Sequence, residues 1–258
     1  MGVIYKTEEE IELLRESSLL VGKTLAEVAK ILKPGVTTLQ MDAIAEEFIR
    51  DHGAKPTFKG YDGFPGSLCT SVNEVVVHGI PDNKPLENGD IVSVDCGVFM
   101  NGFNGDSAYT FKVGEVSNQV NQLLEVTKES LNKAIEQCVE GNRVGDIGSA
   151  VQTYAESYGY GIVRELVGHG LGKDLHEAPE VPNYGKAGRG LKLKNGLVIA
   201  IEPMVTMGDR RIKQLRDGWS IVTFDGLPAA HFEHDVAIIN GRTEVLSTFK
   251  YIEEVLNN

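Results

Sequence analysis

The sequence has few cysteines, no long apolar run and no excess of basic residues, and each of these absences narrows what the protein can be. Its three cysteines, Cys69, Cys96 and Cys138, are scattered along the chain, and no two of them form a C-x-x-C pair. This pattern excludes a cysteine-based zinc site and is typical of proteins that are kept in a reducing cytosol. We therefore expect a cytoplasmic protein.

No stretch of 18 apolar residues occurs, so we expect no membrane span. The N-terminal segment MGVIYKTEEEIELL lacks the apolar core of a signal peptide. Lys6 stands where a myristoylation motif beginning at Gly2 would need Ser or Thr. The formal net charge of −12, with a pI near 5.0, disfavours direct binding to nucleic acid.

The 258 residues are enough for one large α/β domain or two tightly fused halves. Capping boxes at residues 7–10 and 37–40 predict helices that run to about Leu32 and to Gly53. Apolar periodicity predicts two more helices, at 117–138 and 146–157. Strands are expected mainly at 68–78, 90–111, 162–166, 197–205, 219–224, 230–239 and 243–248.

The helical segments repeat along the chain. An offset of 106 residues maps Gly35 onto Gly141 and Gly53 onto Gly159, so each half runs long helix, glycine break, short helix, glycine cap and strands. This repetition indicates an internal duplication, with halves at roughly 1–113 and 114–258. The alternative is two unrelated helix pairs that share common capping residues. A duplication would give pseudo-twofold symmetry, and a site at the seam would collect side chains from both halves.

Residues 90–111, DIVSVDCGVFMNGFNGDSAYTF, predict two strands joined by a tight Asn-Gly turn. A two-residue loop places Asp95 opposite Ala108 and Asp106 opposite Gly97, so the two carboxylates share one face at diagonal positions, roughly 7–8 Å apart. Such a pair can hold one cation, or two cations about 3.5–4 Å apart. Two surface aspartates are the alternative, but the strands are largely apolar and buried carboxylates without partners are costly.

Three further side chains are candidates for chemistry beside those aspartates. His169 lies with His176 in a glycine-rich loop, VGHGLGKDLHEAP, whose spacing excludes the H-E-x-x-H helix of a zincin. A single histidine is often structural, whereas two in such a loop favour function. Glu202 ends an apolar strand and Glu233 stands in the middle of another, although either could instead pair with a buried Lys or Arg.

These candidates form a set of one imidazole and four carboxylates: Asp95, Asp106, His169, Glu202 and Glu233. The set suits two divalent ions that share bridging carboxylates, whereas structural zinc prefers thiolates. Two such ions lower the pKa of a shared water and polarise a carbonyl. Co, Mn, Fe, Zn and Ni are all compatible with these ligands.

The order of these motifs resembles the methionine aminopeptidases, and most of all their bacterial type I form. The matching pattern is Asp, ten residues, Asp, then G-H-G-x-G, H-E-x-P, I-E-P and a late strand glutamate, with further agreement in SVNEVVVHGIP and DGWSIVT. The resemblance extends over nearly the whole chain. It implies a single catalytic domain, 1–258, with an α+β pita-bread fold in which two pseudo-symmetric halves form a curved antiparallel sheet covered by helices.

The resemblance also implies residue roles. Asp95 would hold one metal, Asp106 and Glu233 would bridge both, and His169 with Glu202 would complete the other. A bridging hydroxide would attack the carbonyl after the first residue, with Glu202 as proton shuttle. His176 would stabilise the oxyanion or the scissile amide nitrogen, and His78 would contact the substrate backbone. By position, the apolar methionine pocket would be lined by Phe58, Tyr61, Phe64, Cys69, Leu175 and Trp219.

The implied activity is removal of the initiator methionine from nascent chains whose second residue is small. The implied partners are nascent N-termini, with transient contact with the ribosome, and the implied state is a monomer in the cytoplasm. One alternative is an X-Pro-specific peptidase of the same fold, although such enzymes usually carry a larger N-terminal domain. The other is a non-catalytic pita-bread binding protein, whose signature would be lost metal ligands and a basic tail.

Overall fold

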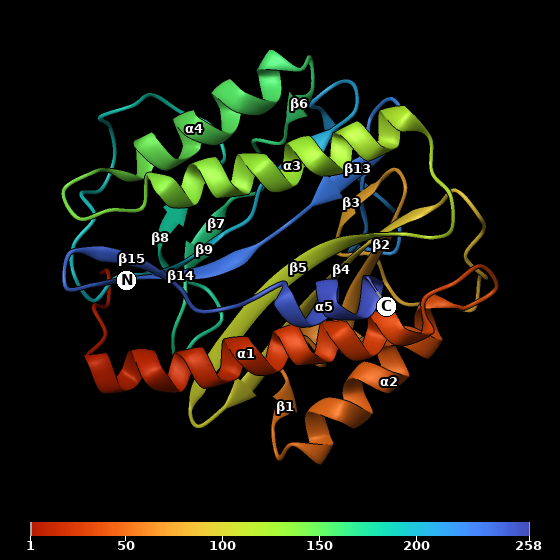
Figure 1. Ribbon diagram of the computed structural model, residues 1–258, viewed down its shortest axis with the longest axis horizontal. Helices are drawn as coiled ribbons and strands as arrows, with labels where there is room; N and C mark the ends of the chain where they lie inside the picture. The colour runs from red at the N-terminus through yellow and green to blue at the C-terminus, as the bar shows by residue number, and fades with distance from the viewer. Residues whose placement is uncertain (1, 258) are drawn as a thin grey trace.

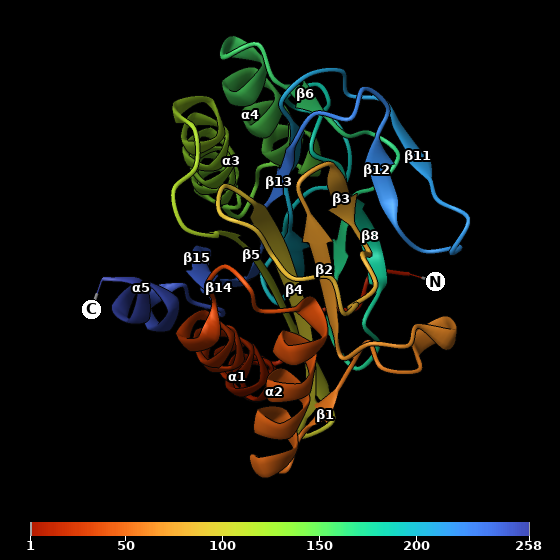
Figure 2. The ribbon, with the colours of Figure 1, turned by 90° about the vertical axis from the view of Figure 1, so that its right-hand side faces the viewer.

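The computed structural model describes residues 2–257. Two pairs of helices flank the strands (Figure 1). The first pair is α1 (Glu8–Ile31) and α2 (Thr38–Asp51), and the second pair is α3 (Asn118–Glu136) and α4 (Val144–Ser157). Seen from the side, α1, α3 and the short C-terminal helix α5 (Lys250–Leu256) lie on the same side of the strands (Figure 2). The helices therefore cover a sheet region, as the α+β prediction requires.

The capping boxes form as predicted. Thr7 Oγ1 accepts a hydrogen bond from Glu10 N at 3.2 Å, and the Glu10 carboxylate accepts one from Thr7 N at 3.1 Å. Thr37 and Gln40 make the same reciprocal pair at the start of α2. Each box satisfies two backbone N–H groups that have no partner within the helix. Local sequence thus determines where α1 and α2 begin.

The two helix pairs correspond closely. Helices α2 and α4 both have 14 residues, and the same 106-residue offset relates both of their ends. Gly35 and Gly141 have φ of 93° and 97°, a left-handed conformation that costs glycine little. These matches agree with an internal duplication, which stays a prediction.

The central hairpin has the predicted register. Strands β4 (Ile91–Met100) and β5 (Phe103–Lys112) pair so that Asp95 faces Ala108 and Asp106 faces Gly97. The turn residues Asn101 and Gly102 have φ of 55° and 84°, as the Asn-Gly sequence predicts. β4 also pairs with β1 (Lys55–Pro56) and β2 (Leu68–Val72), which gives a four-stranded sheet.

The second half supplies most of the remaining strands. A five-stranded sheet has the order β15 (Arg242–Val245), β14 (His234–Ile239), β9 (Val198–Ile201), β7 (Gly168–Gly170) and β8 (Glu177–Val181). A three-stranded sheet contains β13 (Ala229–His231), β10 (Met204–Thr206) and β6 (Gly161–Ile162). A second three-stranded sheet joins β11 (Ile212–Gln214) and β12 (Ile221–Thr223) to β3 (Val75–Val77). All of these pairings are antiparallel.

The predictions for 197–205 and 230–239 as single strands are wrong. Each is two strands, interrupted at Glu202-Pro203 and at Phe232-Glu233, so Glu233 is not in the middle of a strand. β9 pairs with β14, and β10 pairs with β13. The two interruptions therefore lie side by side, between these two pairs of strands. The prediction that His169 lies in a loop is also wrong, because it is the middle residue of β7.

Other boundaries differ by a few residues. The strand predicted at 162–166 is only β6, that at 219–224 is only β12, and that at 243–248 is β15. Helix α4 begins at Val144 because the Asp146 carboxylate accepts a hydrogen bond from Arg143 N at 2.8 Å and serves the cap. The strands β1, β8 and β11 and the helix α5 were not predicted. Within residues 2–257, no helix is both long and apolar enough to cross a membrane.

Candidate metal centre

One cavity of about 290 Å³ brings the predicted site residues together. Its polar lining contains the five candidate metal ligands, Asp95, Asp106, His169, Glu202 and Glu233, and the two further histidines, His78 and His176. Its apolar lining contains the six residues predicted for the methionine pocket: Phe58, Tyr61, Phe64, Cys69, Leu175 and Trp219. Asp62, which was not predicted, also lines it. Residues from both halves of the chain thus meet in one place.

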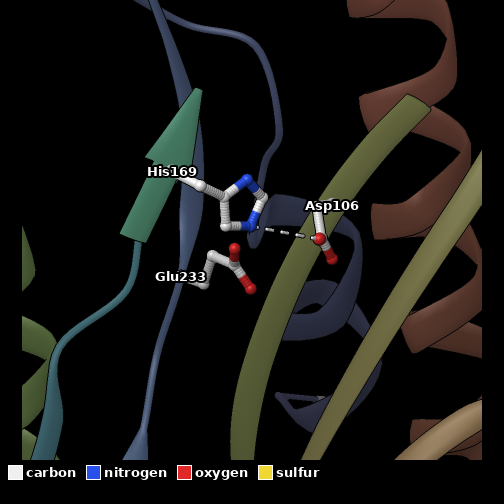
Figure 3. A group of neighbouring side chains, drawn as sticks. All are labelled: Asp106, His169 and Glu233. Atoms are coloured by element: carbon white, nitrogen blue, oxygen red, sulfur yellow. Dashed lines mark ion pairs between the residues drawn. The ribbon is translucent and has the colours of Figure 1, made fainter. Parts of the chain in front are cut away.

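The polar end of the cavity has the geometry of a metal site. Asp106, His169 and Glu233 each present a ligand atom, and these atoms lie within 4.8 Å of one another (Figure 3). His169 Nε2 lies 3.9 Å from Asp106 Oδ2 and 3.7 Å from Glu202 Oε1. These separations are too long for hydrogen bonds. They leave room for a cation between the side chains.

The four carboxyl groups lie together, with Asp106 and Glu233 buried and Asp95 and Glu202 partly buried. Burial raises the pKa of Asp95 to about 7. Burial, and then the proximity of Asp95, raises the pKa of Asp106 and of Glu202 well above the usual range, and burial followed by Asp106 does the same to Glu233. Across residues 2–257, their only ion-pair neighbours within 4 Å are histidines.

Two buried carboxylate oxygens also lack partners. Oδ1 of Asp95 and Oδ1 of Asp106 have no hydrogen-bond partner among the described residues. A buried acceptor without a partner costs about 1–3 kcal/mol. Bound divalent ions would satisfy these oxygens and neutralise the carboxylates, so the residues present fit a metal centre.

His169 is oriented as a metal ligand requires. Its Nδ1 lies 2.9 Å from the Gly170 carbonyl oxygen, so Nδ1 carries the proton and donates to that oxygen. The lone pair is then on Nε2, which faces the carboxylates. Burial lowers the pKa of His169 to about 4, which keeps the imidazole neutral.

The other two predicted histidines lie beside this group. His176 makes an edge contact with His169, with ring centroids 4.4 Å apart, and its Nδ1 is 2.8 Å from the Tyr61 hydroxyl. His78 follows β3 in a left-handed conformation with φ of 58°, which is unusual for a residue with a side chain. Burial lowers the pKa of both His78 and His176.

Two buried residues of the same segment were missed by sequence reasoning. Asp235 Oδ2 accepts hydrogen bonds from Asp106 N at 2.8 Å and from Ser18 Oγ at 2.6 Å, so it ties the Asp106 backbone to α1. His231 is only 1% exposed, and its Nε2 lies 3.7 Å from Glu202 Oε2. The sequence held a signal, because a single strand over AHFEHDVAII, as predicted, would place residues 231, 233 and 235 on one side.

Antiparallel sheets covered by helices, with a cluster of carboxylates and an imidazole in one cavity, indicate a metallopeptidase. The chain belongs to the metallopeptidase family M24, whose model matches residues 12–240. Two relatives within that family bear the same name. The chain is 52% identical to the methionine aminopeptidase of Clostridium acetobutylicum over 95% of this chain and 98% of that protein. It is 49% identical to methionine aminopeptidase 1 of Bacillus subtilis over 95% of this chain and 99% of the relative.

Solved structures agree with the fold. The methionine aminopeptidase of Thermotoga maritima superposes with a TM-score of 0.94 at 43% identity, covering 96% of this chain and 100% of that chain. The prolidase of Pyrococcus furiosus shares the pita-bread fold less closely. Its TM-score is 0.78 at 25% identity, and the match covers 95% of this chain but 65% of the prolidase.

Proposed function

We propose that this chain is a metalloaminopeptidase that removes the N-terminal methionine from peptides and nascent proteins whose second residue is small. The observation that carries the proposal is the cluster of four carboxylates, two buried and two partly buried, and one neutral imidazole in a cavity that also has an apolar wall. Relatives at 49–52% identity over nearly full length bear the name methionine aminopeptidase, which supports the same conclusion. The family also makes this chain a hydrolase that uses a metal.

Asp95, Asp106, His169, Glu202 and Glu233 would hold two divalent ions of the Co, Mn, Fe, Zn or Ni type. When bound, such ions lower the pKa of a water and polarise the scissile carbonyl. Glu202 is placed to take a proton from the attacking water, because its carboxylate faces the centre and lies within 4 Å of both His169 and His231. It would deliver that proton to the leaving amine.

His176 is suited to stabilise negative charge on the substrate. The Tyr61 hydroxyl lies 2.8 Å from His176 Nδ1. In the tautomer in which this hydroxyl donates to Nδ1, Nε2 bears the proton and would donate to the developing oxyanion. His78 lines the same cavity and would bind the substrate backbone. This division gives His176 a role in the transition state and His78 a role in orientation.

The apolar wall would receive the methionine side chain. Phe64 and Trp219 meet edge to face with ring centroids 5.1 Å apart, and Phe58, Cys69 and Leu175 are buried beside them. Such a wall discriminates by about 1–3 kcal/mol per methylene. It therefore favours methionine over shorter side chains, and exclusion of large second residues must come from steric limits at the polar end.

The proposed partners are nascent chain N-termini in the cytoplasm. We also propose transient contact with the ribosome, because the proposed substrates are nascent chains. We also propose that residues 1–258 form one catalytic domain of two related halves, 1–113 and 114–258, with the metal centre at their seam.

Hydrolysis of Met-Ala and Met-Gly peptides by the metal-depleted protein, before and after addition of Mn²⁺ or Co²⁺, tests the proposal. Metal-dependent release of methionine is expected, with much slower release when the second residue is large. An X-Pro dipeptide serves as the comparison substrate. Faster cleavage of X-Pro than of Met-Ala, or no metal-dependent release of methionine, would contradict the proposal.

A further inference from the structure

We infer that the buried ion pair between Lys6 and Glu177 positions the segment that carries Leu175 and His176, so that Lys6 is a positioning residue for the proposed aminopeptidase reaction. The inference rests on the proposed function for its kinetic consequences. The placement of the loop that carries Leu175 and His176 by Lys6 does not depend on the proposed function.

The pair is unusually well buried. The side chains of Lys6 and Glu177 are 3% and 5% exposed, and Lys6 Nζ contacts Glu177 Oε2. The other lysine and arginine ion pairs described in residues 2–257 involve side chains that are at least 22% exposed. Those exposed pairs are held weakly, whereas a buried pair fixes both of its partners firmly in place because neither charge can return to water.

Glu177 uses its second oxygen on the loop itself. Its Oε1 accepts a hydrogen bond from Asp174 N at 3.4 Å, and only Leu175 and His176 lie between these two residues. Both intervening side chains line the cavity. The carboxylate therefore closes a short bridge around the two residues that face the substrate.

The lysine is itself anchored. Its backbone N donates to the Gly196 carbonyl oxygen at 2.7 Å, and its Nζ also donates to the Ile4 carbonyl oxygen at 3.1 Å. Gly172 packs directly on the pair, since a Cβ there would lie 2.2 Å from Glu177 Oε1 and 2.7 Å from Lys6 Cε. This close packing accounts for the last glycine of the GHGLG motif, which the metal centre leaves unexplained.

Loss of the lysine would leave Glu177 as a buried charge without a partner. The carboxylate would then turn towards water and release Asp174, and the His176 ring would lose its fixed distance from His169. Displacement of a catalytic group by about 1 Å can lower the rate by about 100-fold. Because His176 is proposed to act in the transition state, the loss should fall mainly on kcat, with a smaller rise in KM through Leu175.

The test compares Lys6→Met with Lys30→Met, which removes a lysine whose ion pair with Glu27 is exposed. In the Met-Ala assay with saturating Mn²⁺, Lys6→Met is expected to lower kcat by about 10- to 100-fold, whereas Lys30→Met should stay within about twofold of wild type. In a His176→Ala background, Lys6→Met should have little further effect, because residues that act through one another are not additive.

A double variant in which both residues are neutral distinguishes an effect on the position of the loop from an effect on folding. In the double variant Lys6→Met/Glu177→Gln no buried charge is left alone, and the amide oxygen of the substituted side chain can still accept a hydrogen bond from Asp174 N. This variant should regain most of the activity lost in Lys6→Met. Hydrogen exchange of the 171–177 amides gives a readout that does not depend on activity. Exchange there should accelerate in Lys6→Met and remain at the wild-type rate in Lys30→Met.

The inference is overturned if wild type releases methionine while Lys6→Met keeps its kcat within about twofold. It is also overturned if Lys6→Met lowers activity by the same factor in the His176→Ala background, which would indicate a general loss of structure. If wild type itself releases no methionine, the proposed function fails, and the exchange measurement alone then decides whether Lys6 holds the loop.

Discussion

The two halves of the chain bring side chains to the same centre in different ways. The first half uses one continuous hairpin, in which β4 and β5 each run for ten residues and aim Asp95 and Asp106 by register alone. The second half uses a three-residue strand for His169 and interrupted strands for Glu202 and Glu233. The face on which a carboxylate lies can be predicted from strand periodicity when the strand is regular. At an interruption, the position of the carboxylate depends on the residues that pack around it.

The halves also differ in how their second helices are held. In the first, Asp42 of α2 accepts hydrogen bonds from Ser67 N at 2.7 Å and Leu68 N at 2.8 Å. At the equivalent position of α4 stands Gly148, where a Cβ would lie 2.4 Å from the carbonyl oxygens of Pro182 and Tyr184. One helix is attached by a side chain and the other by direct contact of backbones. Substitutions at both sites, and at the ligands, can test this comparison.

The largest effect is expected at the ligands. Asp106→Asn from the first half and Glu233→Gln from the second should each lower metal-dependent methionine release by more than about 100-fold, beyond the loss typical of residues that only support a ligand. Each should also raise the thermal stability of the metal-free protein, because one buried repelling carboxylate is removed. Asp51→Asn, on the exposed side of α2, is the control. Unequal losses from the two variants would show that the halves do not contribute alike.

Asp42→Ala should be the most destabilising change outside the centre. It leaves two buried backbone N–H groups without acceptors, at about 1–3 kcal/mol each, so the free energy of unfolding should fall by about 2–6 kcal/mol. Denaturant titration of the metal-free protein measures this, with Asp51→Ala as the exposed control on the same helix. A loss below about 0.5 kcal/mol would mean that α2 is held by its apolar face alone.

Gly148→Ala should cost less, because helices and loops can shift slightly to admit a methyl group. We expect a fall of about 1–3 kcal/mol in the free energy of unfolding, as is usual for overpacking. Gly2→Ala, at an exposed position with open space around it, is a matched control in the same titration. Higher stability than wild type, the usual result of Gly→Ala in an open helix, would refute the close backbone contact.

The smallest effect concerns pH. Burial raises the pKa of Asp42 above its usual value, despite the opposing hydrogen bonds from Leu68 and Ser67. A carboxyl whose pKa is higher in the folded state stabilises the fold when protonated, and this contribution is lost as the pH rises from the unfolded pKa, near 4, through the folded pKa. Asp42→Asn, which keeps an oxygen acceptor, should therefore be more stable than wild type at pH 7. Denaturant titrations from pH 4 to pH 7 should show that the difference in the free energy of unfolding between Asp42→Asn and wild type becomes smaller as the pH falls. A difference that stays constant with pH would contradict the raised pKa of Asp42.

Sequence reasoning succeeded where the determining interactions are close along the chain. The capping boxes, the Asn-Gly turn and the two-residue periodicity of β4 and β5 depend on neighbours within a few residues, so α1, α2 and the hairpin register were predicted. The interruption at Phe232-Glu233 was not, because that segment alternates without a visible break. The interruption at Glu202-Pro203 was missed although Pro203 disfavours a continuous strand there. For Asp235, alternation with residues 231 and 233 was a signal, but its partners Ser18 and Asp106 are far away in sequence and so its role was missed.

The sequence by itself determined the helices of the first half, the hairpin, the shared face of its two aspartates and, through the motif order, the family. These features depend on local hydrogen bonding and on strand periodicity, which act through adjacent residues. Only the tertiary structure decided that His169, Glu202 and Glu233 meet those aspartates in one buried cavity, and that Lys6 reaches Glu177 behind it. Burial and the removal of water come from long-range packing, and that packing turns separate polar side chains into a site that fits metal ions.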